Sequence, residues 1–166
     1  MHALARHLAN LTVRTAGGTD LEFMKRLYAS TRDDLRRITA DPVFIDTLIA
    51  MQENMQAAGY RNSYPDAEYL ILEYQGEAVG RIVINTDPNE MRLVDIALLP
   101  DARGKGLGKA VMHALQQSAA EKKLPLALSV HRNNSSARRF YLALGFQQVS
   151  NDGMTEQMAW RHPAKD

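Results

Sequence analysis

A glycine-rich stretch between two apolar patterns constrains the fold more than any other part of this sequence. Residues 103–115 read RGKGLGKAVMHAL, in which three glycines alternate with basic residues and a leucine. The preceding segment 91–99, MRLVDIALL, is typical of a buried strand, and Pro100 ends it. Apolar residues after the glycines recur at the spacing of one helical face. The sequence therefore predicts a strand, a glycine loop and a long helix over 107–123.

The glycine loop has the properties of an anion site. The first N–H groups of a helix lack intrahelical partners and carry partial positive charge, so they bind phosphate. Glycine has no Cβ to hold a ligand away, and Arg103, Lys105 and Lys109 add formal charge. The glycine spacing fits neither the dinucleotide fingerprint G-x-G-x-x-G nor the P-loop. A glycine-rich turn without a ligand is the alternative interpretation.

The distribution of charge along the chain agrees with an anionic ligand near this loop. The net charge is only +1, which argues against a nucleic-acid partner. Residues 101–139 nevertheless hold eight Lys or Arg and two Asp or Glu, a local net of +6, so the rest of the chain sums to −5. We expect a small polyanion to bind near this basic block; a solvated basic face is the alternative.

The remaining patterns predict a single domain over residues 1–166, with loose tails at about 1–9 and 162–166. Thr19 or Asp20 is expected to cap the first helix and Asp41 the second, which Gly59 is expected to end. We expect strands at 11–16, 68–74, 78–85, 126–130, 146–149 and 154–160, and further helices at 21–31, 42–58 and 135–144.

Composition narrows the compartment and the chemistry. The chain has no cysteine, which excludes disulfides and thiolate metal ligands and fits the reducing cytoplasm that we expect for it. The first residues lack a signal-peptide pattern, and no apolar run approaches the roughly 18 residues of a membrane span, so we expect no membrane partner. His113 and His131 lack the spacing of a zinc site, so we expect no metal.

Two motifs together resemble the GNAT superfamily of N-acetyltransferases. Arg103-x-x-Gly106-x-Gly108 matches the family pattern R/Q-x-x-G-x-G/A and lies, as in that family, between a strand and a long helix. About 30 residues further on, the segment 133–146, NNSSARRFYLALGF, is similar to the second family motif. Ser135 stands where many members have proline, and both residues suit the first turn of a helix. The resemblance is close over residues 91–149.

This resemblance implies an α/β (α+β) fold with a mixed, mostly antiparallel sheet flanked by about four helices. The sheet would splay open between strands 91–99 and 126–130 to take acetyl-coenzyme A (acetyl-CoA) as a co-substrate. Its pyrophosphate would bind the backbone of the glycine loop, and its pantetheine arm would pair with the end of strand 91–99. The cofactor-binding residues expected on this basis are Ile96, Ala97, Leu98, Arg103, Gly104, Lys105, Gly106, Leu107, Gly108, Lys109, Asn134, Ala137 and Tyr141.

Acetyl transfer by direct attack of an amine needs an acid, a base and a donor to the oxyanion. By its place in the second motif, Tyr141 resembles the family's general acid, and a core aromatic is the alternative. Asp95 interrupts an apolar strand, where a carboxylate is costly unless used or paired, so it is either the base or the partner of Arg81 or Arg92. We expect the oxyanion donor to be an N–H freed near Leu98 by a strand bulge.

Asn134 has two interpretations, because it either binds the cofactor arm or caps the helix that follows. Acceptor recognition is expected from the first two helices and residues 59–69, where the mixed polar residues indicate a small, amino-acid-like amine; for most of them a solvated surface is the alternative. These residues are Tyr28, Arg32, Asp33, Asp34, Tyr60, Arg61 and Tyr64.

The sequence thus favours an acetyltransferase that acts on a small-molecule amine as a monomer or homodimer. A protein N-terminal or lysine acetyltransferase is the alternative within the enzyme class. A non-catalytic acyl-CoA sensor is the alternative from another class.

Overall fold

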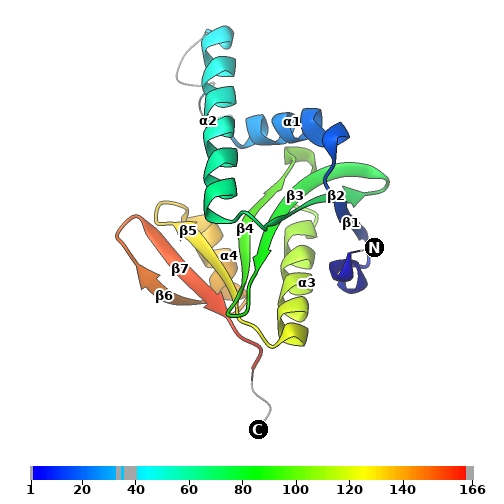
Figure 1. Cartoon of the computed structure of the whole chain (residues 1–166), viewed down its shortest axis with the longest axis vertical. Helices are drawn as coiled ribbons and strands as arrows, with labels where there is room; N and C mark the ends of the chain where they lie inside the picture. The colour runs from blue at the N-terminus through cyan, green and yellow to red at the C-terminus, as the bar shows by residue number, and fades with distance from the viewer. Residues whose placement is uncertain (1, 33–34, 36–40, 164–166) are drawn as a thin grey trace.

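A mixed sheet runs through the computed structural model, which describes residues 2–32, 35 and 41–163 (Figure 1). Its strand order is β1-β2-β3-β4-β5-β7-β6, and all described neighbours are antiparallel except the parallel pair β4–β5. The mixed, mostly antiparallel sheet predicted from the sequence is therefore confirmed. The strands are β1 Leu11–Thr15, β2 Glu68–Tyr74, β3 Glu77–Thr86, β4 Met91–Leu98, β5 Leu126–His131, β6 Gln147–Asn151 and β7 Thr155–Trp160.

Helices cover both faces of the sheet. They are α1 Leu21–Thr31, α2 Pro42–Ser63, α3 Leu107–Lys122 and α4 Ser135–Ala143, with short 3-10 turns η1 Ala3–His7, η2 Gly18–Asp20 and η4 Pro100–Ala102. Apolar residues of α3 and α4 pack with one set of strand residues, including Leu70 and Leu72, whereas α1 packs on the other face around Ile71. This opposite placement follows from the two-residue period of β2, which buries both of its faces.

Helix α2 makes its apolar contacts mainly with α1 rather than with the sheet. Ile45 and Ile49 pack against Tyr28 and Ala29. Figure 1 shows the first half of α2 extending beyond the sheet, and Phe44 in that half is 58% exposed. None of the described helices has the length and apolar character needed to cross a membrane.

The sheet opens between β4 and β5, where the resemblance placed the opening. The two strands pair only at Met91, Arg92 and Leu93 of β4. The next residue, Val94, is a bulge, because Leu93 and Asp95 lie opposite the adjacent β3 residues Ile84 and Val83. A bulge bends its strand, so β4 leaves β5 at this position. We expected the bulge near Leu98, which is wrong by four residues.

Three local expectations are corrected by the structure. Helix α2 does not end at Gly59 but continues to Ser63, since one glycine is tolerated in a helix whose other residues are packed. Asp20 does not cap α1 through its side chain, which instead binds Arg14 and the N–H of Gly17. Residues 3–7, expected within a loose tail, form η1, whose Leu4 is 1% exposed in the core.

Candidate active site

The free edge of β4 faces the opening of the sheet. Leu99 donates its N–H to Val79 of β3, and alternate residues of a strand point the same way. Ala97 therefore also directs its N–H and C=O to β3, whereas those of Ile96 and Leu98 point into the opening. We expected all three backbones to hold the pantetheine arm; the N–H and C=O of Ala97 face β3 instead, and its contact with a cofactor stays a prediction. Its side chain instead lines a hollow on the α1 face.

The start of α3 lies at one end of this opening and presents unpaired N–H groups. The first bond of the helix runs from Ala110 N to Gly106 O, so the N–H groups of Leu107, Gly108 and Lys109 precede it. Gly106 is the N-cap residue and offers no side chain to satisfy them. These donors, at the positive end of the helix dipole, suit a pyrophosphate.

Backbone conformation explains two of the three glycines in this loop. Gly104 and Gly106 have φ of +77° and +76°, which L residues with side chains rarely adopt. A Cβ at either position would meet nothing within 4 Å, so the φ angle rather than crowding requires glycine here. Arg103 beside them donates from Nε to the Leu98 carbonyl oxygen at 3.1 Å, so its guanidinium links the loop to the free edge of β4.

Helix α4 supplies the second motif. Asn134 accepts a hydrogen bond at Oδ1 from the N–H of Ala137 at 3.2 Å, so the capping interpretation of Asn134 is confirmed and its contact with a cofactor stays a prediction. Tyr141 is half-buried, with its ring centroid 5.5 Å from that of Phe140 and 5.7 Å from that of Phe146. Burial, and then the charge of Asp95, raise the pKa of Tyr141. The phenol is therefore protonated at neutral pH.

Asp95 forms an ion pair with Arg81 of β3, one of the two partners expected from the sequence. Arg81 Nη2 lies 2.7 Å from Asp95 Oδ2, and the two side chains are 15% and 21% exposed. Arg92, the other expected partner, instead binds Glu90 at 2.6 Å. The bulge of β4 lies between Arg92 and Asp95. Beyond it, Asp95 lies on the same face of the strand as Ala97, the face that α1 covers.

Two adjoining hollows lie between the helices α1 and α2 and the strands β2 to β4. They share Met24, Gln56 and Arg81. The larger hollow has a volume of about 290 Å³. It is lined by Leu21, Met24, Glu53, Gln56, Ala57, Tyr60, Arg61, Tyr69 and Arg81. The smaller is lined by Met24, Leu27, Tyr28, Thr31, Gln56, Arg81, Asp95 and Ala97.

Several predicted acceptor residues gather at these hollows and others do not. Tyr28, Tyr60 and Arg61 line them, whereas Tyr64 ends α2 and lines neither. Burial, and then the charge of Asp95, raise the pKa of Tyr60. Arg32 lines neither hollow, and the predicted Asp33 and Asp34 lie outside the described residues.

Met24, Gln56 and Tyr69 also line the hollows; they lie within the segments predicted for acceptor recognition, but no sequence signal singled them out. Tyr69 follows the strand alternation that makes it face α1, but nothing in its neighbourhood distinguishes it from a packed strand residue. Gln56 and Met24 are placed by the crossing of α1 and α2, which no local pattern encodes.

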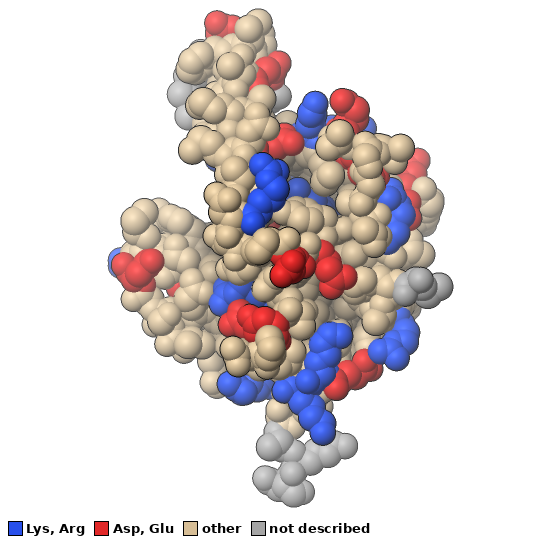
Figure 2. All heavy atoms as spheres, in the orientation of Figure 1, with Lys and Arg blue, Asp and Glu red and all other residues tan. Residues whose placement is uncertain are grey.

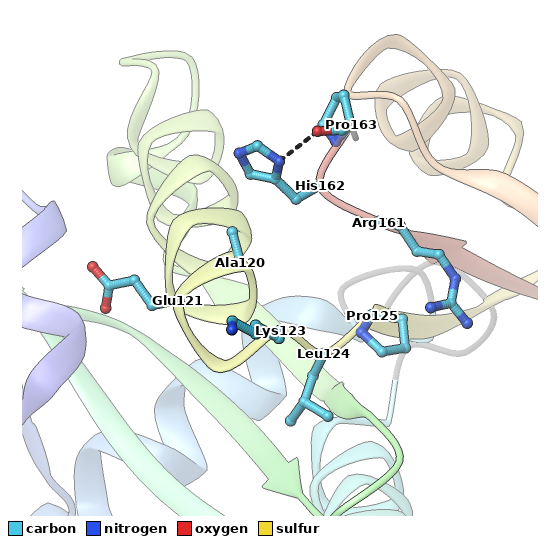
Figure 3. Close-up of a pocket in the computed structure, with 8 residues that line it drawn as sticks. All are labelled: Ala120, Glu121, Lys123, Leu124, Pro125, Arg161, His162 and Pro163. Carbon is cyan, nitrogen blue, oxygen red and sulfur yellow. Dashed lines mark hydrogen bonds between the residues drawn. The ribbon is translucent and has the colours of Figure 1, made fainter. Parts of the chain in front are cut away.

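One further hollow of the molecular surface lies at the opening of the sheet, and another lies apart from the predicted site. Figure 2 shows that the face in view is hollowed between α2 and the part of the molecule formed by β5, β6 and β7, where the sheet opens. A hollow of about 620 Å³ lies at the other end of α3, between Lys123, Pro125 and His162 (Figure 3). None of the predicted site residues lines that second hollow.

Comparisons with known proteins agree with this geometry. The sequence matches the acetyltransferase (GNAT) family over residues 23–146. An uncharacterised N-acetyltransferase of Mycobacterium tuberculosis is 32% identical over 98 residues, which are 57% of this chain and 63% of that relative. The chain thus matches less than two thirds of the relative's length.

Solved structures share the fold. The PaiA N-acetyltransferase of Thermoplasma acidophilum in complex with coenzyme A is 20% identical with a TM-score of 0.68, covering 93% of this chain and 100% of its own. The ribosomal-protein-S18-alanine N-acetyltransferase of Escherichia coli is 20% identical with a TM-score of 0.62, covering 94% and 96%.

Proposed function

Because the chain belongs to the acetyltransferase (GNAT) family, we propose that it transfers an acetyl group from acetyl-CoA to the primary amine of a small molecule. One observation carries this proposal, namely the opening of the sheet between β4 and β5. Phosphate-binding geometry lies at one end of this opening, and the proposed acid and a carboxylate lie near its other end. The unpaired N–H groups of α3 supply the first feature. Tyr141 and Asp95 supply the second, and the charge of Asp95 helps to raise the pKa of Tyr141.

Acetyl-CoA fits the chain along the free edge of β4. The N–H and C=O groups of Ile96 and Leu98 would pair with the amides of the pantetheine arm, like an added strand. The N–H groups at the start of α3 would take the pyrophosphate, with Arg103 beside them. When bound, the thioester supplies an activated acetyl group.

The reaction that we propose is direct attack. The acceptor ammonium loses a proton to Asp95 or to water, and its nitrogen then bonds to the thioester carbonyl carbon. Whichever N–H of Ile96 or Leu98 the pantetheine arm leaves free stabilises the oxyanion. The C–S bond breaks and the sulfur takes a proton from the Tyr141 hydroxyl. As the amide forms, the nitrogen loses its second proton, which passes through water to the Tyr141 phenolate and restores the phenol.

A protein N-terminus is the second candidate acceptor. The open hollow between α2 and β5–β7 in Figure 2 favours it, because an extended peptide needs an uncovered approach to the thioester. The Escherichia coli protein that shares this fold is a ribosomal-protein-S18-alanine N-acetyltransferase, which also favours a protein acceptor.

A thiol-release assay with acetyl-CoA tests both candidates. We expect release with at least one member of a panel of small amines, and weaker release with unstructured peptides. Peptides that outperform every small amine would instead support the second candidate. If acetyl-CoA binds but no amine or peptide releases thiol, the chain is a non-catalytic binder and the proposed reaction is wrong.

The glycine loop gives a binding control for the same assay. Gly106→Val places a β-branched residue at a φ of +76° beside the proposed pyrophosphate, so acetyl-CoA affinity measured by calorimetry should fall. Gly153→Val is a matched control, because its φ is +94° and its surroundings are equally open, but it lies in the β6–β7 turn. Equal affinities of the two variants would remove the loop from the cofactor site.

A further inference from the structure

The Arg81–Asp95 ion pair leaves polar atoms of both partners unused at the two adjoining hollows between α1, α2 and strands β2 to β4, here together called the acceptor hollow. Among the described residues only Arg81 bonds Asp95, and it does so through Oδ2, so Oδ1 has no protein partner there. Arg81 Nη1 faces only the sulfur of Met24, at 3.9 Å, and Nε is buried with no hydrogen-bond partner. A carboxylate and a guanidinium thus stand side by side, and each retains hydrogen-bonding capacity.

We infer that this pair recognises an amine and a carboxylate on the same acceptor, so that the substrate is an α-amino acid with an apolar side chain. The inference rests on the proposed function. In an α-amino acid one carbon separates the ammonium from the carboxylate, so a site that holds both needs an anion and a cation in contact. Asp95 would take the ammonium, and Arg81 would take the carboxylate in the forked geometry that guanidinium favours.

Charge balance in the hollow favours a zwitterion over a simple amine. Its charged lining residues are Glu53, Arg61, Arg81 and Asp95, which sum to zero. A lone alkylammonium would have to share the Asp95 carboxylate with the Arg81 cation, which like-charge repulsion disfavours. A zwitterion adds an anion that faces Arg81, so no uncompensated charge is buried.

The size and the walls of the hollow agree with an amino acid. The larger of the two adjoining hollows, of about 290 Å³, is lined by Arg81 and is close to the lower limit for small-molecule sites, whereas Asp95 lines only the smaller one of about 30 Å³ beside it. The ammonium would therefore enter the smaller hollow and the side chain would occupy the larger. Tyr60, Tyr69 and Met24 form apolar walls beside the ion pair, which suits an aliphatic or aromatic side chain.

Three matched acceptors test the inference: phenylalanine, phenylalaninamide and phenethylamine. In the thiol-release assay we expect kcat/KM for phenylalanine to exceed that for phenethylamine by at least about 10-fold, because the amine leaves Arg81 unpaired. Phenylalaninamide should fall between them, since it offers an acceptor oxygen without charge. A competitive calorimetric titration of the three compounds in the presence of coenzyme A measures the same order without requiring turnover.

The acid-to-amine ratio is kcat/KM for phenylalanine divided by kcat/KM for phenethylamine. The Arg81→Gln variant should reduce this ratio to near unity, chiefly through a higher KM for phenylalanine. Arg81→Lys should restore part of the ratio, because it keeps the charge and loses the fork. Arg92→Gln is the matched control: Arg92 is 16% exposed and also ion-paired, but it lies outside both hollows, so the ratio should stay parental.

Two different failures are distinguishable. Phenethylamine used or bound as well as phenylalanine, or an acid-to-amine ratio unchanged in Arg81→Gln, would overturn the zwitterion inference and leave acetyl transfer intact. If Arg81→Gln does not fold, the comparison of acceptors with the parental protein decides alone. No thiol release with any amine or peptide would contradict the proposed function itself.

Discussion

The surroundings of Tyr141 show the core packing that was one of its two interpretations, and its role as the acid stays a prediction. Its ring packs against Phe140 and Phe146 at the edge of the core, as the core interpretation requires. Its hydroxyl has no hydrogen-bond partner among the described residues, and burial raises its pKa. Packing therefore fixes the ring and keeps the phenol protonated, which are both properties that a general acid needs.

Tyr141→Phe separates these roles, because it keeps the ring and removes only the hydroxyl. If Tyr141 is the acid, kcat should fall by roughly 10²–10⁴-fold while acetyl-CoA affinity and the melting temperature stay nearly parental. The measurement is kcat and KM for one confirmed amine, with a melting curve for each protein. A variant that retains more than half of the parental kcat, with chemistry rate-limiting, would leave Tyr141 a packing residue only.

Asp20 is the buried carboxylate with the clearest consequence for stability. Hydrogen bonds from Arg14 at 2.7 and 2.9 Å and from the N–H of Gly17 lower its pKa from 3.8 to about 2. A group whose pKa is lower in the folded state than in the unfolded chain stabilises the fold at pH values above its unfolded pKa. It loses that contribution as the pH falls through its folded pKa. The stabilising effect of Asp20 should thus be complete above about pH 5 and disappear between 3.8 and about 2.

Asp20→Asn should therefore lower the free energy of unfolding at pH 6 by about 1–2 kcal/mol, allowing for screening of the partly exposed Arg14. Urea unfolding of both proteins at pH 6 and near pH 2.5 checks this expectation. The difference between them should shrink at the lower pH. A difference that is the same at both pH values would show that Asp20 acts through packing rather than through its charge.

Among the elements, α2 shows how far a local signal can mislead. Asp41 caps it as expected, accepting from the N–H groups of Val43 and Phe44. Gly59 was expected to end it, but the helix continues for four residues to Ser63. The last turn places Tyr60 and Arg61 in the lining of the larger hollow, so the extra length of the helix supplies part of the proposed acceptor site.

Gly59→Ala should stabilise the protein. Gly59 is exposed inside a helix, and a Cβ there would meet nothing within 4 Å. Alanine in an exposed helix interior is favoured over glycine by about 0.5–1 kcal/mol, so the free energy of unfolding in urea should rise by that amount.

Gly76→Ala is the control for this experiment. It replaces a turn glycine with a φ of +81° and should destabilise the protein. Loss of stability in Gly59→Ala would instead indicate that the helix ends at Gly59, as its sequence alone suggested.

At the scale of the whole molecule, charge is divided between the cofactor side and the remainder. The +6 block of residues 101–139 includes the loop cations Arg103 and Lys105 and, at the far end of α3, Lys122 and Lys123. The helix of 16 residues separates these two groups by about 24 Å, more than two Debye lengths at 0.1 M salt. Of these four cations, Arg103 and Lys105 should therefore contribute strongly to cofactor affinity, and Lys122 and Lys123 should not.

Acetyl-CoA affinity should fall as salt rises, and the Arg103→Ala/Lys105→Ala double variant should flatten that dependence. Calorimetric titrations at about 50 mM and about 500 mM NaCl provide the measurement. The Lys122→Ala/Lys123→Ala variant removes the same amount of charge at the opposite end of α3 and should keep the parental slope. Salt-independent binding by the parental protein, or equal slopes for the two variants, would contradict steering by the loop.

The sequence by itself determined the elements and the two motifs. The order of strands and helices, the cap residues Asp41 and Asn134 and the glycine loop were all predictable, because each depends on residues a few positions apart. The opening of the sheet was predictable only through the family resemblance carried by these motifs.

Only the tertiary structure decided how distant residues meet. It selected Arg81 rather than Arg92 as the partner of Asp95, and it placed the bulge at Val94. It also brought Tyr69 of β2 and Tyr60 of α2 to one hollow. Strand register, a single bulge and the crossing of two helices set these contacts, and a one-residue change in register would reverse which side chains face the site. Such contacts join residues far apart in the chain, so no local pattern contains them.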